Sequence, residues 1–305
     1  MKYIIGVDGG GTSTHAVAFD LNGVMLQEAY DGFSNVLIDS QVAINNIVRA
    51  IKKCTATLPI EDCVYLFLGL AGIDSGLYRP ELEAELRNFN IPFTIVNDAV
   101  IAHAASLDGT DGILAISGTG SVIYGKKADQ FQMIGGWGHL LGDEGSGYWI
   151  TTQYLKQMII TFEEGGKITD AGKKILEAMN VTEIPKMKSF VYNHPKKEIA
   201  ALTPLIVTAA NEGDNTAIKI LNQAGYSLAK QVLLAVAKMN FSETDAIKIG
   251  LKGSILTKVD MVNETFKREI LAQIPEVLFI EDQPSSAKGA FLLAKKILEK
   301  AENHK

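Results

Sequence analysis

The chain carries the same succession of segments twice, and this duplication limits the folds available to it. In each half an apolar run ends in a turn rich in glycine, threonine and serine, and another apolar run follows the turn. The two turns are residues 8–14 (Asp-Gly-Gly-Gly-Thr-Ser-Thr) and residues 117–121 (Ser-Gly-Thr-Gly-Ser). Short apolar runs bounded by such turns are typical of buried β-strands. The repeat therefore predicts two similar domains built on one structural plan.

The later parts of the two halves also correspond. A Gly-Leu-x-Gly sequence ends an apolar run at Gly69 and again at Gly250. A further apolar run ends at Asp98 in the first half and at Asp282 in the second, and a helical pattern follows each aspartate. The second half is longer before its Gly-Leu-x-Gly sequence. The extra length contains helical patterns at residues 144–163, about 169–180, 202–212 and 216–239.

These patterns predict an α/β fold with a duplicated unit and a helical insertion in the second copy. The 305 residues, 47% of them hydrophobic, suit two domains with sizeable cores. We expect an N-terminal domain over residues 1–110 and a C-terminal domain over residues 111–284, with the insertion at about 144–240. Residues 285–305 are expected to form a helix that packs back toward the N-terminal domain.

The first turn can be interpreted in two ways. A dinucleotide fingerprint or a Walker loop needs a helix after its glycines, whereas here a second strand is predicted. The segment is then either a plain hairpin or a phosphate cradle made of backbone N–H groups and the hydroxyls of Thr12, Ser13 and Thr14. The similar second turn favours the cradle. Because neither turn contains lysine or arginine, we expect Mg²⁺, held by Asp8 through water, to help neutralise the phosphates.

Asp98 follows the strand pattern of residues 93–96 and precedes a helical pattern. An aspartate at such a boundary is often a helix N-cap. However, open α/β sheets bind ligands beyond the carboxyl ends of their strands. The position therefore also suits a carboxylate that acts on a substrate.

Residues 135–149 form the most unusual stretch of the chain, with six glycines, two tryptophans, a histidine and the adjacent carboxylates Asp143 and Glu144. Such a loop could be a plain connector. A ligand site explains its composition better, because glycines allow a ligand to approach the backbone and tryptophan offers it a flat apolar wall.

Composition excludes several other classes. The net charge of -6 argues against a general nucleic-acid binder. Cys54 and Cys63 are the only cysteines, which are too few for a disulfide framework or a cysteine-rich metal centre. No secretory leader or membrane-spanning run is recognisable, so we expect a cytoplasmic protein without a membrane partner.

Taken together, the motifs resemble the N-acetylglucosamine kinase family, which is grouped with the BadF/BadG/BcrA/BcrD-type ATPases in the actin/hexokinase superfamily of sugar kinases. The matching residues occur in family order over nearly the whole chain. They are Asp8–Thr12, Asn35, Asn97-Asp98-Ala99, residues 117–121, residues 135–146 and residues 250–254.

The resemblance implies two ribonuclease-H-like domains around a central cleft, which close on ATP, Mg²⁺ and an amino sugar. It implies phosphorylation of N-acetylglucosamine to its 6-phosphate, with Asp98 as the general base, and a homodimer. The nucleotide-binding residues it implies are Gly9, Gly10, Gly11, Thr12, Thr119, Gly120, Gly253 and Thr257. The sugar-binding residues it implies are Asn35, Asp98, Ser121, Gly136, Trp137, Gly138 and Asp143.

Alternatives remain at this stage. Val36 stands where animal enzymes of the family carry a polar residue that touches substrate, so glucosamine, N-acetylmuramic acid and glucose also remain open as substrates. An ATPase activator of an acyl-CoA dehydratase or reductase would share the turns, but it needs cysteines near the domain junction for an iron–sulfur cluster. A non-catalytic sugar-binding regulator is a further alternative, and the presence of Asp8, Asp98 and both turns argues against it.

Overall fold

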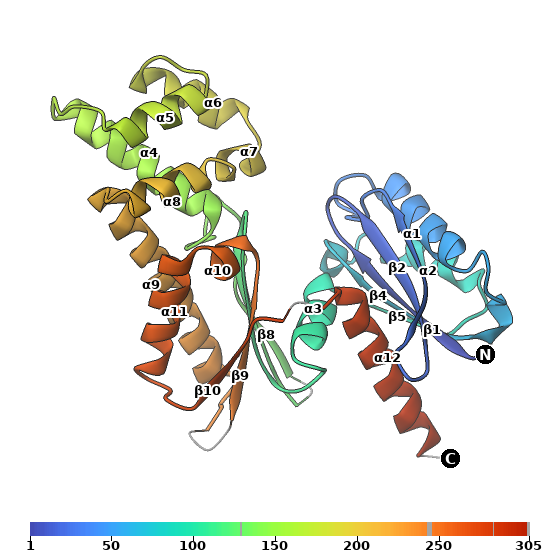
Figure 1. Ribbon diagram of the computed structural model, residues 1–305. Coiled ribbons are helices and arrows are strands. Elements are labelled where there is room, and N and C mark those ends of the chain that lie inside the picture. The colour runs from blue at the N-terminus through green and yellow to red at the C-terminus, as the bar shows by residue number, and fades with distance from the viewer. Residues whose placement is uncertain (129, 243–245, 283, 304–305) are drawn as a thin grey trace. The chain divides into compact units, whose positions relative to one another are not determined.

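The computed structural model describes residues 1–128, 130–242, 246–282 and 284–303. The chain divides into two compact units, which Figure 1 shows in full. The first unit combines Met1–Thr110 with Asp282–Lys305, and the second comprises Asp111–Glu281. Within the described ranges, no helix has both the length and the apolar character needed to cross a membrane.

The first unit contains a five-stranded mixed sheet in the order β3-β2-β1-β4-β5. The first three strands form antiparallel hairpins, and β4 and β5 run parallel to β1. The strands are β1 (Tyr3–Gly9), β2 (Thr14–Asp20), β3 (Met25–Asp31), β4 (Cys63–Leu70) and β5 (Phe93–Val96). The helices are α1 (Ser40–Cys54), α2 (Arg79–Arg87), α3 (Asp98–Ser106) and α12 (Ser286–Glu302).

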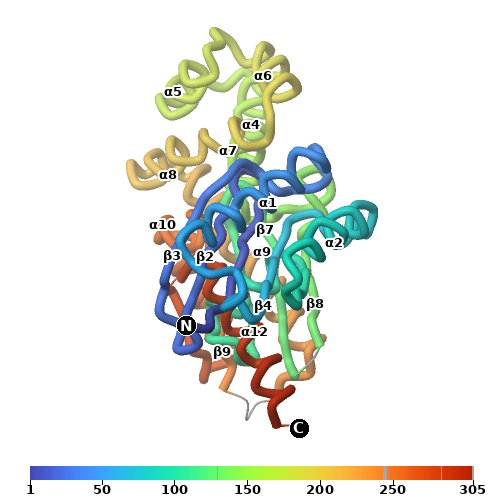
Figure 2. The backbone as a smooth tube through the Cα atoms, turned by 90° about the vertical axis from the view of Figure 1, so that its right-hand side faces the viewer, coloured from blue at the N-terminus to red at the C-terminus, as the bar shows by residue number. Residues whose placement is uncertain are grey.

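Alternate side chains of β1 enter two different cores, as expected for a strand covered on both faces. Ile5 and Val7 pack in a cluster that includes residues of α1 and α2, whereas Ile4 packs with Phe291 of α12 and with Ile101 of α3. Helix α12 contacts α3, β1 and β4, and Figure 2 shows it beside β4. This approach is close, because a Cβ on Gly6 would collide with the backbone of α12.

The second unit repeats the sheet. Its order is β10-β9-β6-β7-β8, so each strand has a counterpart at the same place in the first sheet. The directions correspond as well, because β6, β7 and β8 are antiparallel neighbours whereas β9 and β10 run parallel to β6. The predicted duplicated α/β fold is therefore confirmed. The strands are β6 (Gly112–Ser117), β7 (Ser121–Lys127), β8 (Gln130–Gly135), β9 (Ile247–Lys252) and β10 (Val277–Ile280).

Helices between β8 and β9 form the insertion, and the longest of them, α9, packs along the sheet and against α4, α8 and α11 (Figure 1). The four helical patterns predicted for the insertion are present, with bounds that differ by a few residues. The helices are α4 (Gly147–Glu163), α5 (Asp170–Ala178), α6 (Met187–Asn193), α7 (Lys196–Ala200), α8 (Thr203–Asn211) and α9 (Asn215–Lys238). Two more, α10 (Ser254–Lys258) and α11 (Asp260–Leu271), follow β9.

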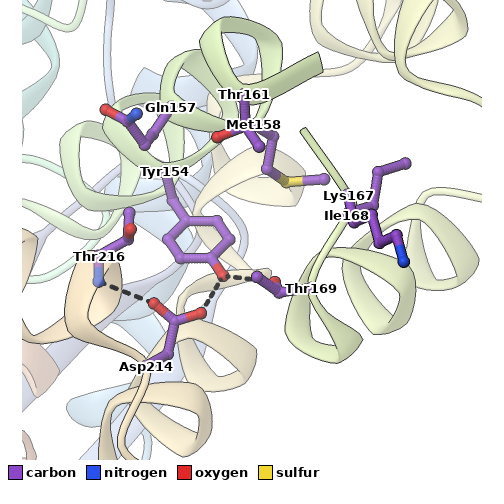
Figure 3. A pocket seen from close by; sticks show the side chains of 9 residues that line it. All are labelled: Tyr154, Gln157, Met158, Thr161, Lys167, Ile168, Thr169, Asp214 and Thr216. Atoms are coloured by element: carbon purple, nitrogen blue, oxygen red, sulfur yellow. Dashed lines mark hydrogen bonds between the residues drawn. The ribbon is translucent and has the colours of Figure 1, made fainter. Parts of the chain in front are cut away.

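A partly buried polar network joins these insertion helices (Figure 3). Asp214 caps α9 by accepting the N–H groups of Thr216 and Ala217, both at 2.9 Å, and Tyr154 of α4 donates its hydroxyl to the same carboxylate at 2.8 Å. Burial raises the pKa of Tyr154 to about 12, so this hydroxyl stays protonated. The adjoining cavity measures only about 40 Å³, and the network is therefore structural.

Candidate active site

The carboxylates of the first unit are positioned by the strand register. Asp8 of β1 lies opposite Gly69 of β4, and Gly69 lies opposite Val96 of β5. Neighbouring strands are about 4.8 Å apart, so Asp8 and the end of β5 are separated by about 10 Å across the sheet. Asp98 begins α3 just beyond that end. Both predicted carboxylates thus lie at the same edge of this sheet.

The first turn joins β1 to β2 as a hairpin, as predicted. The Gly10 N–H donates to the Ser13 carbonyl at 2.9 Å, and the Gly10 carbonyl accepts the Asn35 N–H at 3.2 Å. Gly11 and Thr12 are exposed at the tip. The prediction that the Thr14 hydroxyl serves this turn is wrong. Thr14 is the first residue of β2 and is fully buried, and its hydroxyl donates to a main-chain carbonyl at 2.7 Å.

Asn35 lies between the first turn and the loop that follows β4. Its backbone N–H binds the turn, and its side-chain oxygen accepts the Leu37 N–H at 3.0 Å. A Cβ on Gly72 would come within 2.5 Å of that oxygen. The asparagine is therefore held in place from two sides at the sheet edge that carries Asp8.

Asp98 is not the cap of α3. Asn97 has the extended backbone of an N-cap, and its side-chain oxygen accepts the Ala99 N–H at 2.9 Å. The Asn97 amide also donates to Asp74 at 2.5 Å. Asp98 is the first helical residue and is half-buried. Of the two interpretations of Asp98, helix capping is therefore wrong. The other, a half-buried carboxylate that acts on a substrate, remains as a prediction.

The second turn is fastened to the glycine-rich loop. The Gly118 carbonyl accepts the Gly147 N–H at 2.8 Å, and the Ser117 hydroxyl donates to the Gly145 carbonyl at 2.9 Å. The Ser121 hydroxyl donates to the Glu144 carbonyl at 2.8 Å. These bonds fix the turn against the segment that leads into α4. Thr119 remains exposed at its tip.

Asp143 has an unusual environment within this loop. It adopts a left-handed backbone with φ of 62° and is only 3% exposed. Its carboxylate accepts the Ser121 N–H at 3.3 Å and lies 2.5 Å from the ammonium group of Lys196. The helix that Asp143 and Glu144 were expected to begin starts at Gly147 instead, because Ser146 caps it by accepting the Trp149 N–H.

Lys196 adds a side-chain cation that the sequence analysis did not foresee at the second turn. Neither turn contains a cation, but Lys196 of α7 brings one to the second turn from the insertion. The side chain lies so close to Gly120 that a Cβ there would collide with its ammonium group. No local sequence signal could have predicted this contact, because α7 and the turn are far apart along the chain.

A cavity of about 580 Å³ adjoins the second turn within the second unit. Its walls come from Gly118 and Thr119, from helices α7 and α8, and from α10. Lys197 and Lys258 add positive charge to an otherwise largely apolar lining. Gly253 precedes α10 with φ of 91°, and a Cβ there would collide with the Ser117 carbonyl. A side chain would therefore push α10 away from the turn.

Gly136 and Gly138 have positive φ values of 73° and 81°, and they flank Trp137, which is 70% exposed. Leu140 is also exposed, at 82%. Large apolar side chains that leave the core in this way are available to a ligand. His139 packs edge-on against Tyr148, with their ring centres 4.8 Å apart, and links the loop to α4.

The donor set for a cation is sparse. The described part of the chain holds no group of three or more histidine, cysteine, aspartate or glutamate side chains that could bind a metal ion. Mg²⁺ commonly binds through one or two carboxylates together with phosphates and water. Asp8, at the end of β1 beside the first turn, fits that mode of binding.

Comparison with known proteins places the chain in a family. A model of the BadF/BadG/BcrA/BcrD ATPase family matches residues 5–294. The chain belongs to this family. An N-acetylmuramic acid/N-acetylglucosamine kinase from Clostridium acetobutylicum is 30% identical over 97% of the chain and 99% of its own length. An N-acetyl-D-glucosamine kinase from Dictyostelium discoideum is 28% identical over 96% of the chain and 98% of its own length.

Solved structures of other proteins have the same fold. A Chromobacterium violaceum protein proposed to be an N-acetylglucosamine kinase superposes with a TM-score of 0.75 at 23% identity, over 96% of this chain and 99% of that one. A ROK-family glucokinase from Streptomyces griseus gives 0.58 at 16% identity, over 96% and 98%. These likenesses confirm the predicted actin-like fold. The roles of individual residues in binding and catalysis stay predictions.

Proposed function

We propose that this protein is an ATP-dependent kinase of an amino sugar and that N-acetylglucosamine, converted to its 6-phosphate, is the preferred substrate. The observation that carries the proposal is the position of Asp98, at the same sheet edge as Asp8 and relieved of helix capping by Asn97. The family match and the amino-sugar kinases among its relatives support the substrate class.

Phosphoryl transfer depends mainly on positioning and on the neutralisation of charge. Asp98 accepts the proton of the C6 hydroxyl while that oxygen attacks the γ-phosphorus, and ADP leaves with the electrons of the broken P–O bond. Asp8 is the side chain that would hold Mg²⁺, and the ion, when bound, would supply positive charge to the phosphates.

Within each unit we propose residues that bind the nucleotide: the first turn in the first unit, and the second turn with its adjoining cavity in the second. Backbone N–H groups of Gly9, Gly10 and Gly11 and the exposed hydroxyl of Thr12 bind phosphate oxygens. Thr119 and Gly120 do the same from the second turn. The 580 Å³ cavity has room for the nucleoside beside α10, where Gly253 and Thr257 lie. Lys197 and Lys258 on its wall favour an anionic ligand.

The residues that we propose to bind the sugar are Asn35 and Asp98 in the first unit and Ser121, Gly136, Trp137, Gly138 and Asp143 in the second. Trp137 forms an apolar wall for the ring, flanked by the backbone of Gly136 and Gly138. Asn35 and Asp143 bind its hydroxyls and amide, and the backbone of Ser121 lies beside Asp143. A homodimer in the cytoplasm is part of the same proposal.

The cysteines fit this activity better than the activator alternative. Cys54 and Cys63 are buried, and burial raises the pKa of their thiols to about 11 and about 12. Iron–sulfur clusters are held by thiolates, which these sites disfavour.

The test is ADP release in the presence of ATP, Mg²⁺ and one sugar at a time, with N-acetylglucosamine, N-acetylmuramic acid, glucosamine and glucose as the panel. We expect the highest kcat/KM with N-acetylglucosamine, and the product should carry its phosphate on O6 by NMR. If a sugar binds but none stimulates ADP release, the non-catalytic regulator would be favoured and the kinase proposal rejected.

A further inference from the structure

The ion pair between Lys196 and Asp143 differs from the other pairs of the insertion. Its two side chains are only 27% and 4% exposed, whereas Lys186 and Glu183, which pair at 3.1 Å near α6, are both more than half exposed. Burying two charges is costly, and such a pair contributes little net stability compared with apolar residues. Stability alone therefore gives a weak explanation for its presence.

The backbone also favours a specific role for Asp143. A left-handed conformation is unfavourable for a residue other than glycine, and it persists where the surroundings enforce it. Here it turns the carboxylate toward the Ser121 N–H and the Lys196 ammonium. Asp143 is one of the residues proposed above to bind the sugar.

The same ammonium group lies against the second turn. Gly120 leaves room for it, because a Cβ there would collide with the ammonium group and would lie only 3.1 Å from the Asp143 carboxylate. Thr119 and Gly120 are the residues proposed to bind phosphate. One cation thus contacts the predicted sugar-binding carboxylate and adjoins the predicted phosphate-binding turn.

We propose that Lys196 is a positioning residue shared by the two substrates. It holds the Asp143 carboxylate in the orientation that binds the sugar, and its ammonium also binds a phosphate oxygen when the nucleotide occupies the second turn. This inference rests on the proposed kinase function and goes beyond it, because it predicts that one side chain couples the binding of the two substrates.

The coupling follows from electrostatics. The Asp143 carboxylate and a nucleotide phosphate are both negative and would repel each other across this partly buried site. The ammonium of Lys196 between them offsets that repulsion. Without it, the nucleotide phosphate would repel the carboxylate that binds the sugar, so bound nucleotide should lower the affinity for the sugar. Thermodynamic linkage requires the sugar to lower the affinity for the nucleotide by the same factor.

The experiment is calorimetric titration of N-acetylglucosamine with and without the non-hydrolysable analogue AMPPNP and Mg²⁺. In the wild type the analogue should leave sugar affinity unchanged or raise it. In Lys196→Met it should lower sugar affinity by about 5-fold or more. Lys196→Arg, which keeps the charge, should recover most of the wild-type behaviour. Lys186→Ala is the matched control, because it removes an exposed lysine of the same insertion, and it should behave as the wild type.

Lys196→Met leaves a buried carboxylate unpaired and could destabilise the protein, so a second pair of variants separates the roles. Asp143→Asn removes the carboxylate, and the double variant Asp143→Asn/Lys196→Met removes both charges. If Lys196 contacts phosphate, the double variant should bind AMPPNP about 10-fold more weakly than Asp143→Asn does.

Equal AMPPNP affinities of these two variants would show that the lysine serves Asp143 alone, and the inference would be overturned. It would be overturned as well if Lys196→Met kept the wild-type coupling. These outcomes are distinct from failure of the proposed function, which would appear as a wild-type protein that turns over no sugar. The AMPPNP titrations can be read without turnover, and a wild type that binds neither ligand would reject both proposals.

Discussion

Asn97 caps helix α3 and thereby leaves Asp98, its neighbour in the chain, in the first helical turn. The capping bond runs from the Ala99 N–H to the Asn97 side-chain oxygen at 2.9 Å, and the Asn97 amide is anchored on Asp74. Two tasks that an aspartate at this boundary could combine are thus divided between two residues. Substitution of Asp98 therefore tests its proposed role as general base without removing the N-cap of α3.

Replacement of Asp98 by asparagine should abolish most of the turnover and spare ligand binding. Loss of a general base commonly costs about 10²- to 10⁴-fold in rate. We expect kcat to fall within that range, while calorimetric affinities for the sugar and for AMPPNP change by no more than a few-fold.

Asn97→Ala is the matched control, because it should lower the free energy of unfolding by about 1 kcal/mol through loss of the cap. Its kcat should fall far less than that of Asp98→Asn. An Asp98→Asn protein with wild-type kcat would show that another group accepts the proton.

A side chain at Gly253 should weaken nucleotide binding. Alanine there meets two penalties, an unfavourable φ of 91° and a collision with the Ser117 carbonyl beside the second turn. Gly165→Ala is the control, since that residue also has a positive φ of 76° but nothing lies within 4 Å of the added Cβ. We expect Gly165→Ala to lose only about 1 kcal/mol of stability, the conformational cost.

Gly253→Ala should lose more stability than Gly165→Ala in denaturant unfolding, and its KM for ATP should also rise. An unchanged KM for ATP in a folded Gly253→Ala protein would argue against a nucleotide at α10.

Features with a local signal could be predicted from the sequence. The two turns, the Gly-Leu-x-Gly sequences and the strand-end aspartates follow from composition and spacing over a few residues, and the duplicated sheets confirm them. Strand β8 was not predicted because it is exposed along most of its length. Ile134 is its one buried residue, and the polar–apolar alternation of its sequence extends only over residues 130–133.

Features that depend on contacts between distant segments could not be predicted. The approach of Lys196 to Asp143 arises only when the insertion folds against the sheet of the second unit. The inward direction of the Thr14 hydroxyl depends on which face of β2 is buried, and the turn sequence does not specify that face.

Asp31 should make stability depend on pH. It ends β3 and accepts two hydrogen bonds from Arg49 of α1, at 2.8 and 3.1 Å, and a third from Lys53 at 2.9 Å. Its side chain is only 7% exposed. The hydrogen bonds from the Arg49 guanidinium hold the pKa of Asp31 well below its usual range, even though burial opposes this effect.

Because the pKa of Asp31 is lower in the folded state than in the unfolded state, its contribution is fully present above the unfolded value of about 3.9 and is lost as pH falls below it. Asp31→Asn should therefore lower the free energy of unfolding by about 2 kcal/mol at pH 7. The difference from the wild type should be the same at pH 6 and should shrink below about pH 4.

Urea unfolding at several pH values measures this effect. Asp170→Asn is the control, since Asp170 pairs with Lys173 on a fully exposed surface and should show no measurable change. A difference between Asp31→Asn and the wild type that persisted undiminished at pH 3 would refute the assignment to ionisation.

Trp137 should contribute to the binding of the sugar and hardly at all to the stability of the fold. Its side chain is 70% exposed, so Trp137→Ala removes little buried surface and should change stability by less than about 0.5 kcal/mol. Loss of an aromatic wall costs a bound ring roughly 1 kcal/mol or more. We therefore expect KM for N-acetylglucosamine to rise about 5- to 10-fold while KM for ATP stays nearly constant. Leu140→Ala is the matched control, because Leu140 lies on the same loop, is 82% exposed and has no proposed contact with the sugar. If both variants raised the sugar KM equally, the loop as a whole would be responsible, and the role given to the Trp137 ring would be wrong.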